Sequence, residues 1–93
     1  MLFVTIYTLS AMAKKQTNDP RCISLGLSIK RARGERKLSQ EKLAEMADIH
    51  TSYIGQIERG LRYPSLKVIF KIADALNIKV SDLFRDIDAR KNK

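Results

Sequence analysis

The chain has 93 residues and a formal net charge of +8, with 44% hydrophobic and 30% charged residues. This length supports one small domain, and the composition is that of a globular protein, which excludes a disordered tail and a membrane-embedded chain. The excess of positive charge indicates a polyanionic partner, and no membrane partner is expected.

Residues 1–12, MLFVTIYTLSAM, form an apolar run without charge. The run is too short to span a bilayer, and no basic residue precedes it as in a signal peptide, although residues 11–13 are similar to a cleavage site. We favour a start of translation at Met12, which would leave residues 1–11 untranslated. The expected organisation is a flexible extension over residues 1–22, a folded domain over residues 23–88 and a charged tail over residues 89–93.

The first helix is predicted from about Ile23 to Lys37, because apolar residues recur at helical spacing on one side of it. Just before it, the lone Cys22 is expected to be a small buried hydrophobe rather than a redox sensor. One cysteine and one histidine exclude an internal disulfide and a zinc site, and they fit a reducing, cytoplasmic location. The apolar stripe consists of Leu25, Ile29 and Ala32.

Residues 40–59, QEKLAEMADIHTSYIGQIER, are predicted to form two short helices joined by a tight turn at residues 48–50. Ser39 is a natural N-cap for the first of them. Apolar residues gather where the two helices would touch, which is the pattern of a DNA-reading helix-turn-helix. These contact residues are Leu43, Ala44, Ala47, Ile49, Ile54 and Ile57.

The outward face of the second short helix carries no apolar side chain and consists of Thr51, Ser52, Gly55, Gln56 and Arg59. Hydroxyl and carboxamide groups can bond base edges, and Gly55 would leave room for a close approach. Glutamine can bond adenine bidentately, so Gln56 is the first candidate for base reading. An ordinary solvated helix surface is the alternative for any one of these residues.

Two basic segments flank this helix pair in the sequence, from Arg21 to Lys37 and from Arg59 to Lys67. Such segments are expected to clamp the phosphates on both sides of a helix inserted into a groove. Tyrosines 53 and 63 could equally be half-buried packing residues. The predicted phosphate-binding track consists of Tyr53, Arg59, Arg62, Tyr63 and Lys67.

Two further helices are predicted after Gly60, which ends the second short helix. Ser65 is a candidate N-cap for the longer of them, and Asn77 can end that helix in the left-handed conformation. Ser81 is expected to cap the last helix, which gives five helices and no strand. The apolar positions of these two helices are Leu66, Ile69, Ile72, Ala73, Leu76, Leu83, Phe84 and Ile87.

Over residues 25–84, the segments LSQEKLAEMADI, YIGQIERG and PSLKVIFKIADALNIKVSDLF closely resemble the Cro/repressor-type helix-turn-helix family of phage and bacterial transcription regulators. The resemblance implies an all-α fold, a compact five-helix lambda-repressor-like DNA-binding domain with the helix-turn-helix at helices 2 and 3. It also implies a phosphate bond from Gln40, base reading by Thr51, Ser52 and Gln56 with His50 beside them, and an ion pair between Arg33 and Glu58. The pair also makes physical sense, because an unpaired buried acid is costly.

Two positions depart from the family pattern. Asp48 stands in the turn where glycine is usual, and aspartate tolerates a positive φ better than most residues, so the turn is expected to form with modest strain. His50 stands where serine or threonine would cap the next helix better. A phosphate contact or packing against the turn is favoured for this histidine over base reading.

One domain of this size covers only a few base pairs, so a homodimer on a palindromic operator is predicted. The predicted function is a dimeric repressor or autoregulator that binds double-stranded DNA through the major groove. A restriction-modification controller, an antitoxin and a protein-interaction adaptor are alternatives with the same fold. The candidate dimer interface is Val80, Leu83, Phe84 and Ile87, although these side chains could instead close the monomer core.

An enzyme is not expected, because the chain has one histidine and one cysteine. It also lacks a glycine-rich phosphate loop and a pair of acids at catalytic spacing, and it has little room for a pocket. For the same reasons no cofactor, metal or small-molecule ligand is predicted.

Overall fold

Five α-helices follow one another in the computed structural model, which describes residues 16–90, and that range contains no strand. The expected all-α, five-helix fold is therefore confirmed. Residues 1–15, which include the apolar run and the proposed start of translation, and residues 91–93 lie outside the described residues. The helices are α2 (Pro20–Glu35), α3 (Gln40–Ala47), α4 (Thr51–Glu58), α5 (Leu66–Leu76) and α6 (Val80–Arg90).

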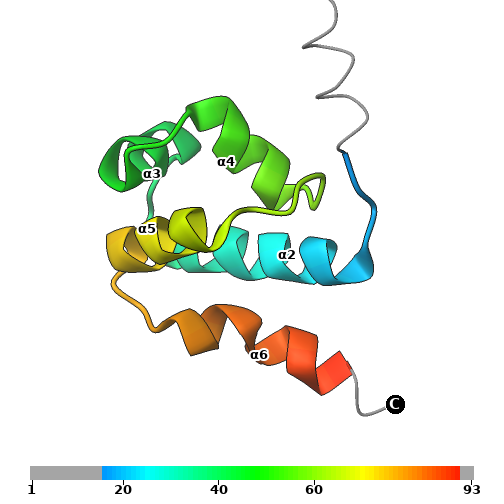
Figure 1. Cartoon of the computed structure of the whole chain (residues 1–93). Coiled ribbons are helices and arrows are strands. Elements are labelled where there is room, and N and C mark those ends of the chain that lie inside the picture. Colours follow the sequence, from blue (N-terminus) through cyan, green and yellow to red (C-terminus); the bar gives the residue numbers. More distant parts are fainter. Residues whose placement is uncertain (1–15, 91–93) are drawn as a thin grey trace, which may run out of the picture.

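Helix α2 runs through the centre of the fold and packs against both α4 and α6. In Figure 1, α3 and α4 lie above α2, and α6 lies beneath it. Because α3 contacts α4 and α5, and α5 contacts α6, the helices close around one apolar core. No helix within residues 16–90 has the length and hydropathy required to cross a membrane. The buried core residues are Leu25, Ile29, Ala32, Leu43, Ala44, Ala47, Ile54, Ile57, Ile69, Ile72, Ala73, Leu76 and Leu83.

The predicted apolar stripes supply this core, and Phe84 and Ile87 pack against it half-buried. Leu66 was expected to be buried, but its side chain is 62% exposed at the first position of α5. The buried residues of that helix begin only at Ile69. Ile49 is half-buried and packs against the core, as expected from its place between the two short helices.

Local sequence signals set several helix ends. The hydroxyl of Ser39 accepts a hydrogen bond from the backbone N–H of Lys42 at 3.0 Å. Ser65 accepts in the same way from the N–H of Val68 at 3.2 Å, so both predicted N-caps are confirmed. Asn77 ends α5 in the left-handed conformation, with φ 56°, which confirms its predicted role.

The first helix differs from its predicted bounds at both ends. It begins at Pro20 rather than Ile23, because the carboxylate of Asp19 caps it and proline fits the first helical position, where no N–H is required. It ends at Glu35 rather than Lys37. Lys37 lies beyond the helix with φ 56°, a left-handed conformation that stops the chain from continuing as a helix.

The last helix also differs from expectation. Because α6 begins at Val80, Ser81 lies inside its first turn and is not the N-cap. The helix continues to Arg90, so it includes residues that were assigned to the charged tail.

Asp48 adopts the left-handed conformation in the turn between α3 and α4, with φ 56° and ψ 50°. The backbone N–H of the next residue, Ile49, donates to the carbonyl oxygen of Ala44 at 3.0 Å. This bond closes the end of α3 in a helix-end motif in which glycine usually occupies the left-handed position. The turn that the sequence predicted therefore forms around an aspartate.

Replacing Asp48 with glycine is expected to leave the free energy of unfolding unchanged or to raise it by up to about 1 kcal/mol. Glycine removes the left-handed strain but adds backbone entropy to the unfolded chain, and the two effects partly cancel. Urea unfolding measures the change. Asp48→Ala is the matched control and should destabilise, because alanine tolerates positive φ less well than aspartate. A clear loss of stability in Asp48→Gly would contradict this account.

Candidate nucleic-acid interface

Helix α4 presents a polar edge to the outside while its apolar side faces the core. Ile54 and Ile57 are 0% and 1% exposed, and they fix the rotation of the helix about its axis. Of the predicted base-reading residues, Ser52 is exposed, and Thr51 and Gln56 are half-buried. The edge therefore offers hydroxyl and amide groups from the outer side of α4.

Gly55 does not lie on this open edge, because it is buried. A Cβ atom added to Gly55 would lie 3.7 Å from Oε1 and 3.9 Å from Nε2 of Gln40. The Gln40 side chain thus covers the glycine and occupies the room that was predicted for a base edge.

Glu58 joins three parts of the fold through its carboxylate. Arg33 on α2 donates from Nε to Oε2 of Glu58 at 2.6 Å and from Nη2 to Oε1 at 3.1 Å. Gln40 donates from Nε2 to Oε1 at 2.9 Å. The Glu58 side chain is only 2% exposed, and its hydrogen bonds raise the pKa of Arg33. The structure therefore contains the Arg33–Glu58 ion pair. The amide nitrogen of Gln40 is directed towards the same carboxylate.

His50 is the residue at the N-cap position of α4, but its side chain makes no capping hydrogen bond. The exposed imidazole stands next to Thr51 at the start of the polar edge. This geometry agrees with the expectation that a serine or threonine would cap the helix better.

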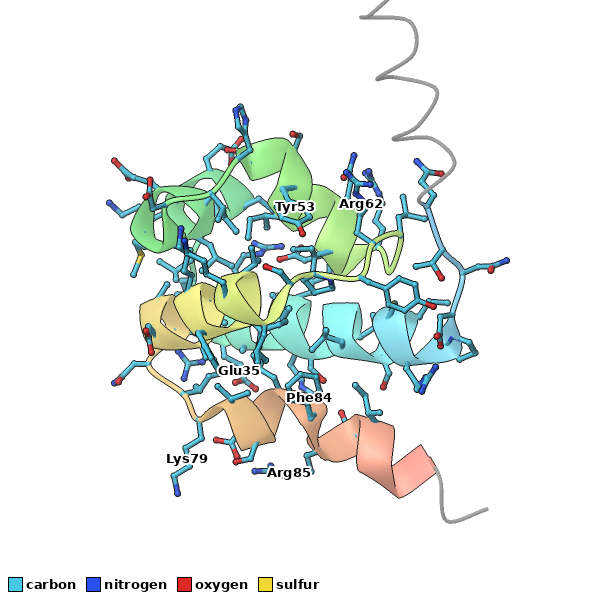
Figure 2. All side chains as sticks on the ribbon, viewed as in Figure 1. Glu35, Tyr53, Arg62, Lys79, Phe84 and Arg85 are labelled. Carbon is cyan, nitrogen blue, oxygen red and sulfur yellow. The ribbon has the colours of Figure 1, made fainter. Side chains whose placement is uncertain are left out.

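The loop after α4 carries Arg62, whose side chain turns back onto the helix. Nε of Arg62 donates to Oε1 of Gln56 at 3.0 Å. Its guanidinium carbon lies 5.9 Å from the centre of the Tyr53 ring, within the range of a cation–π contact. Figure 2 shows Tyr53 and Arg62 on the same side of the molecule, at α4 and the loop that follows it. Tyr53 is half-buried and packs against the core, so one side of its ring is anchored.

Tyr63 is largely exposed, yet its hydroxyl is engaged within the protein. It donates to Oδ2 of Asp19 at 2.8 Å, and the backbone N–H of Thr17 donates to the carbonyl oxygen of Leu61 at 2.9 Å. These two bonds tie the segment before α2 to the loop after α4. Asp19 and Thr17 fell within the expected flexible extension, and the Asp-Pro pair at positions 19 and 20 was the helix-start signal that could have revealed the connection.

Asp19 is the centre of a small hydrogen-bonded cluster. The Arg21 guanidinium lies 3.0 Å from the Asp19 carboxylate, and the Arg21 backbone N–H also donates to it. These bonds and the Tyr63 hydroxyl hold the pKa of Asp19 well below its usual range, with the Arg21 side chain as the main cause. The aspartate is therefore ionised at neutral pH, and the helix cap and the loop connection are both present.

Three arginines of the first basic segment make contacts within the protein. Arg31 pairs with Asp86 on α6 at 2.9 Å, on the side of α2 that faces away from α4. Arg36 donates from Nε to the carbonyl oxygen of Leu76 at 2.6 Å. Together with Arg33 in its ion pair, these arginines hold α2 against the rest of the fold. In the second segment, Arg59 and Lys67 are exposed.

The candidate dimer residues on α6 divide into two groups. Leu83 is 1% exposed and closes the monomer core, so it offers no surface to a second chain. Val80, Phe84 and Ile87 are half-buried. Phe84 and Ile87 line an apolar groove of about 370 Å³, with further walls from Tyr63, Pro64, Leu66 and Ile69.

Comparison with known proteins defines the class to which this fold and polar edge belong. Residues 29–83 match the helix-turn-helix family HTH_3, and the chain belongs to this family, which confirms the resemblance inferred from the sequence. It is 46% identical over 59 residues to the immunity repressor protein of Bacillus phage phi105, a match that spans 63% of this chain and 41% of the repressor.

Two solved structures share the fold. The restriction-modification controller protein C.AhdI from Aeromonas hydrophila is 40% identical, with a TM-score of 0.67, and the match covers 68% of this chain and 96% of C.AhdI. SinR, the master regulator for biofilm formation, was solved in complex with DNA. It is 37% identical, with a TM-score of 0.62 and coverage of 63% of this chain and 95% of SinR.

Proposed function

We propose that this protein is a transcriptional regulator that binds double-stranded DNA in a sequence-specific manner, with α4 as the recognition helix in the major groove. The observation that carries the proposal is the charge of α4. Its one acid, Glu58, is buried and paired with Arg33, so the outward edge brings hydrogen-bonding groups and no negative charge to the DNA. The similarity to a phage repressor and to SinR, solved with DNA, supports the same function.

In this arrangement Ser52, Thr51 and Gln56 face the bases. Arg59 and Lys67, exposed beyond the end of α4, face the phosphates and set the position of the protein on the duplex. Gln40 keeps one N–H on Glu58 and can turn its second amide proton towards a phosphate. Gly55 lies beneath the Gln40 side chain and is not assigned a contact with a base.

The regulator is proposed to act in the cytoplasm as a homodimer, because one recognition helix reads too few base pairs for useful specificity. Its partner surface is the part of α6 that the core leaves accessible, at Val80, Phe84 and Ile87. The exposed Leu66 extends that apolar surface onto α5. Neither an enzymatic activity nor a small-molecule effector is part of the proposal.

A restriction-modification controller is the second candidate within the same class. The specific observation in its favour is the coverage of C.AhdI, of which this chain matches 96% at 40% identity. Both candidates predict that the protein binds DNA upstream of its own gene. Two measurements separate either regulator from an adaptor that binds only proteins. One is a gel-shift assay with that region, and the other is transcription from the promoter with and without the protein.

Selection of bound duplexes from a random library tests the proposed function directly. The wild-type protein should enrich a two-fold symmetric site whose half-sites lie about one helical turn, roughly 10 base pairs, apart. Gln56→Ala should lose the preference at one position in each half-site, while overall folding, measured by circular dichroism, stays unchanged. Enrichment of no sequence over competitor DNA at moderate salt would refute the proposal, and an asymmetric single site would refute the homodimer.

A further inference from the structure

Arg62 connects two residues of the recognition helix that lie one turn apart. Its Nε is bonded to the amide oxygen of Gln56, and its guanidinium stands over the ring of Tyr53. Tyr53 packs against the core and is half-buried, and Arg62 is also half-buried. The carboxamide of Gln56 is therefore supported by a neighbouring side chain before any DNA is present.

The loop that carries Arg62 is itself held in place at several points. The backbone N–H of Gly60 donates to Ile57 at 3.0 Å, and that of Leu61 donates to Gln56 at 2.9 Å. Gly60 has φ +76°, and a Cβ atom there would lie 2.7 Å from Cα of Ile23, so the loop rests against the backbone of α2. With the Thr17 bond to Leu61 on its other side, the loop presents Arg62 from a fixed backbone.

A guanidinium group donates hydrogen bonds and accepts none, so it determines which way a glutamine amide faces. The oxygen of Gln56 must be directed to Arg62, and the amide nitrogen, which carries two donor protons, occupies the other branch of the carboxamide. The remaining N–H groups of Arg62 are also donors. Together the two side chains present a surface of hydrogen-bond donors beside the outward edge of α4.

We infer that Arg62 is a positioning residue that makes Gln56 select guanine rather than adenine at the base pair it reads. Guanine shows two acceptors, N7 and O6, in the major groove, which match a surface of donors. Bidentate contact with adenine needs the glutamine oxygen as well as its nitrogen, and the bond from Arg62 takes one of the two lone pairs of that oxygen and fixes its direction. The inference rests on the proposed function, and it replaces the expectation from the sequence that Gln56 reads adenine.

The experiment measures the guanine-to-adenine preference at one base pair. The selection above, repeated with Gln56→Ala, identifies the position whose preference depends on Gln56. Affinities of purified protein are then measured for two duplexes that differ only in guanine or adenine there. Wild type should favour guanine, and Arg62→Met should reduce that preference by about fivefold or more, because the freed glutamine can contact adenine with both of its atoms.

Arg59→Met is the matched control, since it removes the same charge near the end of α4 without touching Gln56. It should weaken binding to both duplexes equally and lower the salt dependence of binding, with the guanine-to-adenine ratio unchanged. Arg62→Lys provides a second variant that retains the charge. This lysine variant should keep the salt dependence but lose part of the preference, which distinguishes orientation of the amide from charge alone.

Two results would overturn the inference while leaving the proposed function intact. One is a wild-type preference for adenine at the position that Gln56 controls. The other is an equal loss of affinity for both duplexes in Arg62→Met, with a salt slope reduced by about 1, which is the behaviour of a simple phosphate ligand. If Gln56→Ala changes no base preference at all, base reading by Gln56 is wrong, and the role of Arg62 falls with it.

Discussion

Replacing Gly26 with alanine is expected to destabilise the protein by about 3 kcal/mol or more, or to prevent folding. An added Cβ atom would lie 2.3 Å from the carbonyl oxygen of Ile57 and 2.6 Å from that of Glu58. Both are backbone atoms at the end of the recognition helix, so neither can rotate away as a side chain would. Relief of the clash requires α2 and α4 to separate, which opens the core between them. Urea unfolding followed by circular dichroism measures the loss.

Gly34, on the same helix, is the matched control. Nothing lies within 4 Å of an added Cβ atom at that position. Gly34→Ala should therefore raise the free energy of unfolding by about 0.5–1 kcal/mol, since alanine loses less backbone entropy in a helix than glycine. Equal effects of the two substitutions would show that helix propensity, and not the approach of α2 to α4, determines the requirement at Gly26.

Replacing Glu58 with alanine is expected to destabilise the fold by about 3–5 kcal/mol, the usual result of removing one member of a buried ion pair. Arg33 is 16% exposed, so its charge would be left partly buried without the carboxylate, and Gln40 would lose its acceptor. The loss should be measurable by urea unfolding at neutral pH. A loss below about 1 kcal/mol would mean that the guanidinium is rehydrated in the variant and that the pair contributes little, as surface pairs do.

The double variant Arg33→Met with Glu58→Leu removes both charges of the pair. Comparing it with Glu58→Ala shows how much of the lost stability comes from leaving the Arg33 charge without a partner. It should be less destabilised than Glu58→Ala, because two apolar side chains fill the site and no buried charge remains. Its outward edge still carries no acid, so it should retain measurable DNA binding if the pair serves stability and charge neutralisation. Complete loss of DNA binding in a folded double variant would instead give Arg33 or Glu58 a direct part in recognition.

The helices and most of the core could be predicted from the sequence because their signals are local. Apolar side chains spaced three and four residues apart marked the buried sides of all five helices. Ser39, Ser65 and Asn77 marked helix ends through their own hydrogen bonds or backbone preference. The prediction was wrong at Leu66, which has the correct spacing but lies before the first buried turn of α5.

Features that depend on distant parts of the chain could not be predicted in this way. Gly26 carried no local signal, because its neighbours are backbone oxygens more than thirty positions away. Arg36 appeared as one cation of a basic run, yet its bond to Leu76 stabilises the fold. The position of Arg62 on Gln56 depends on how the loop after α4 turns, which side-chain spacing does not encode.

The anchoring of Thr17 and Asp19 has a practical meaning for work with this protein. The chain enters the folded part beside Leu61 and Tyr63, next to the loop that supports Gln56. Helix α6 and its end at residue 90 lie on the opposite side of α2 from α4 (Figure 1). A purification tag or fluorescent fusion joined directly before residue 16 would therefore start beside the loop that supports Gln56, whereas a fusion joined to the end of α6 would start on the side of α2 away from the recognition helix.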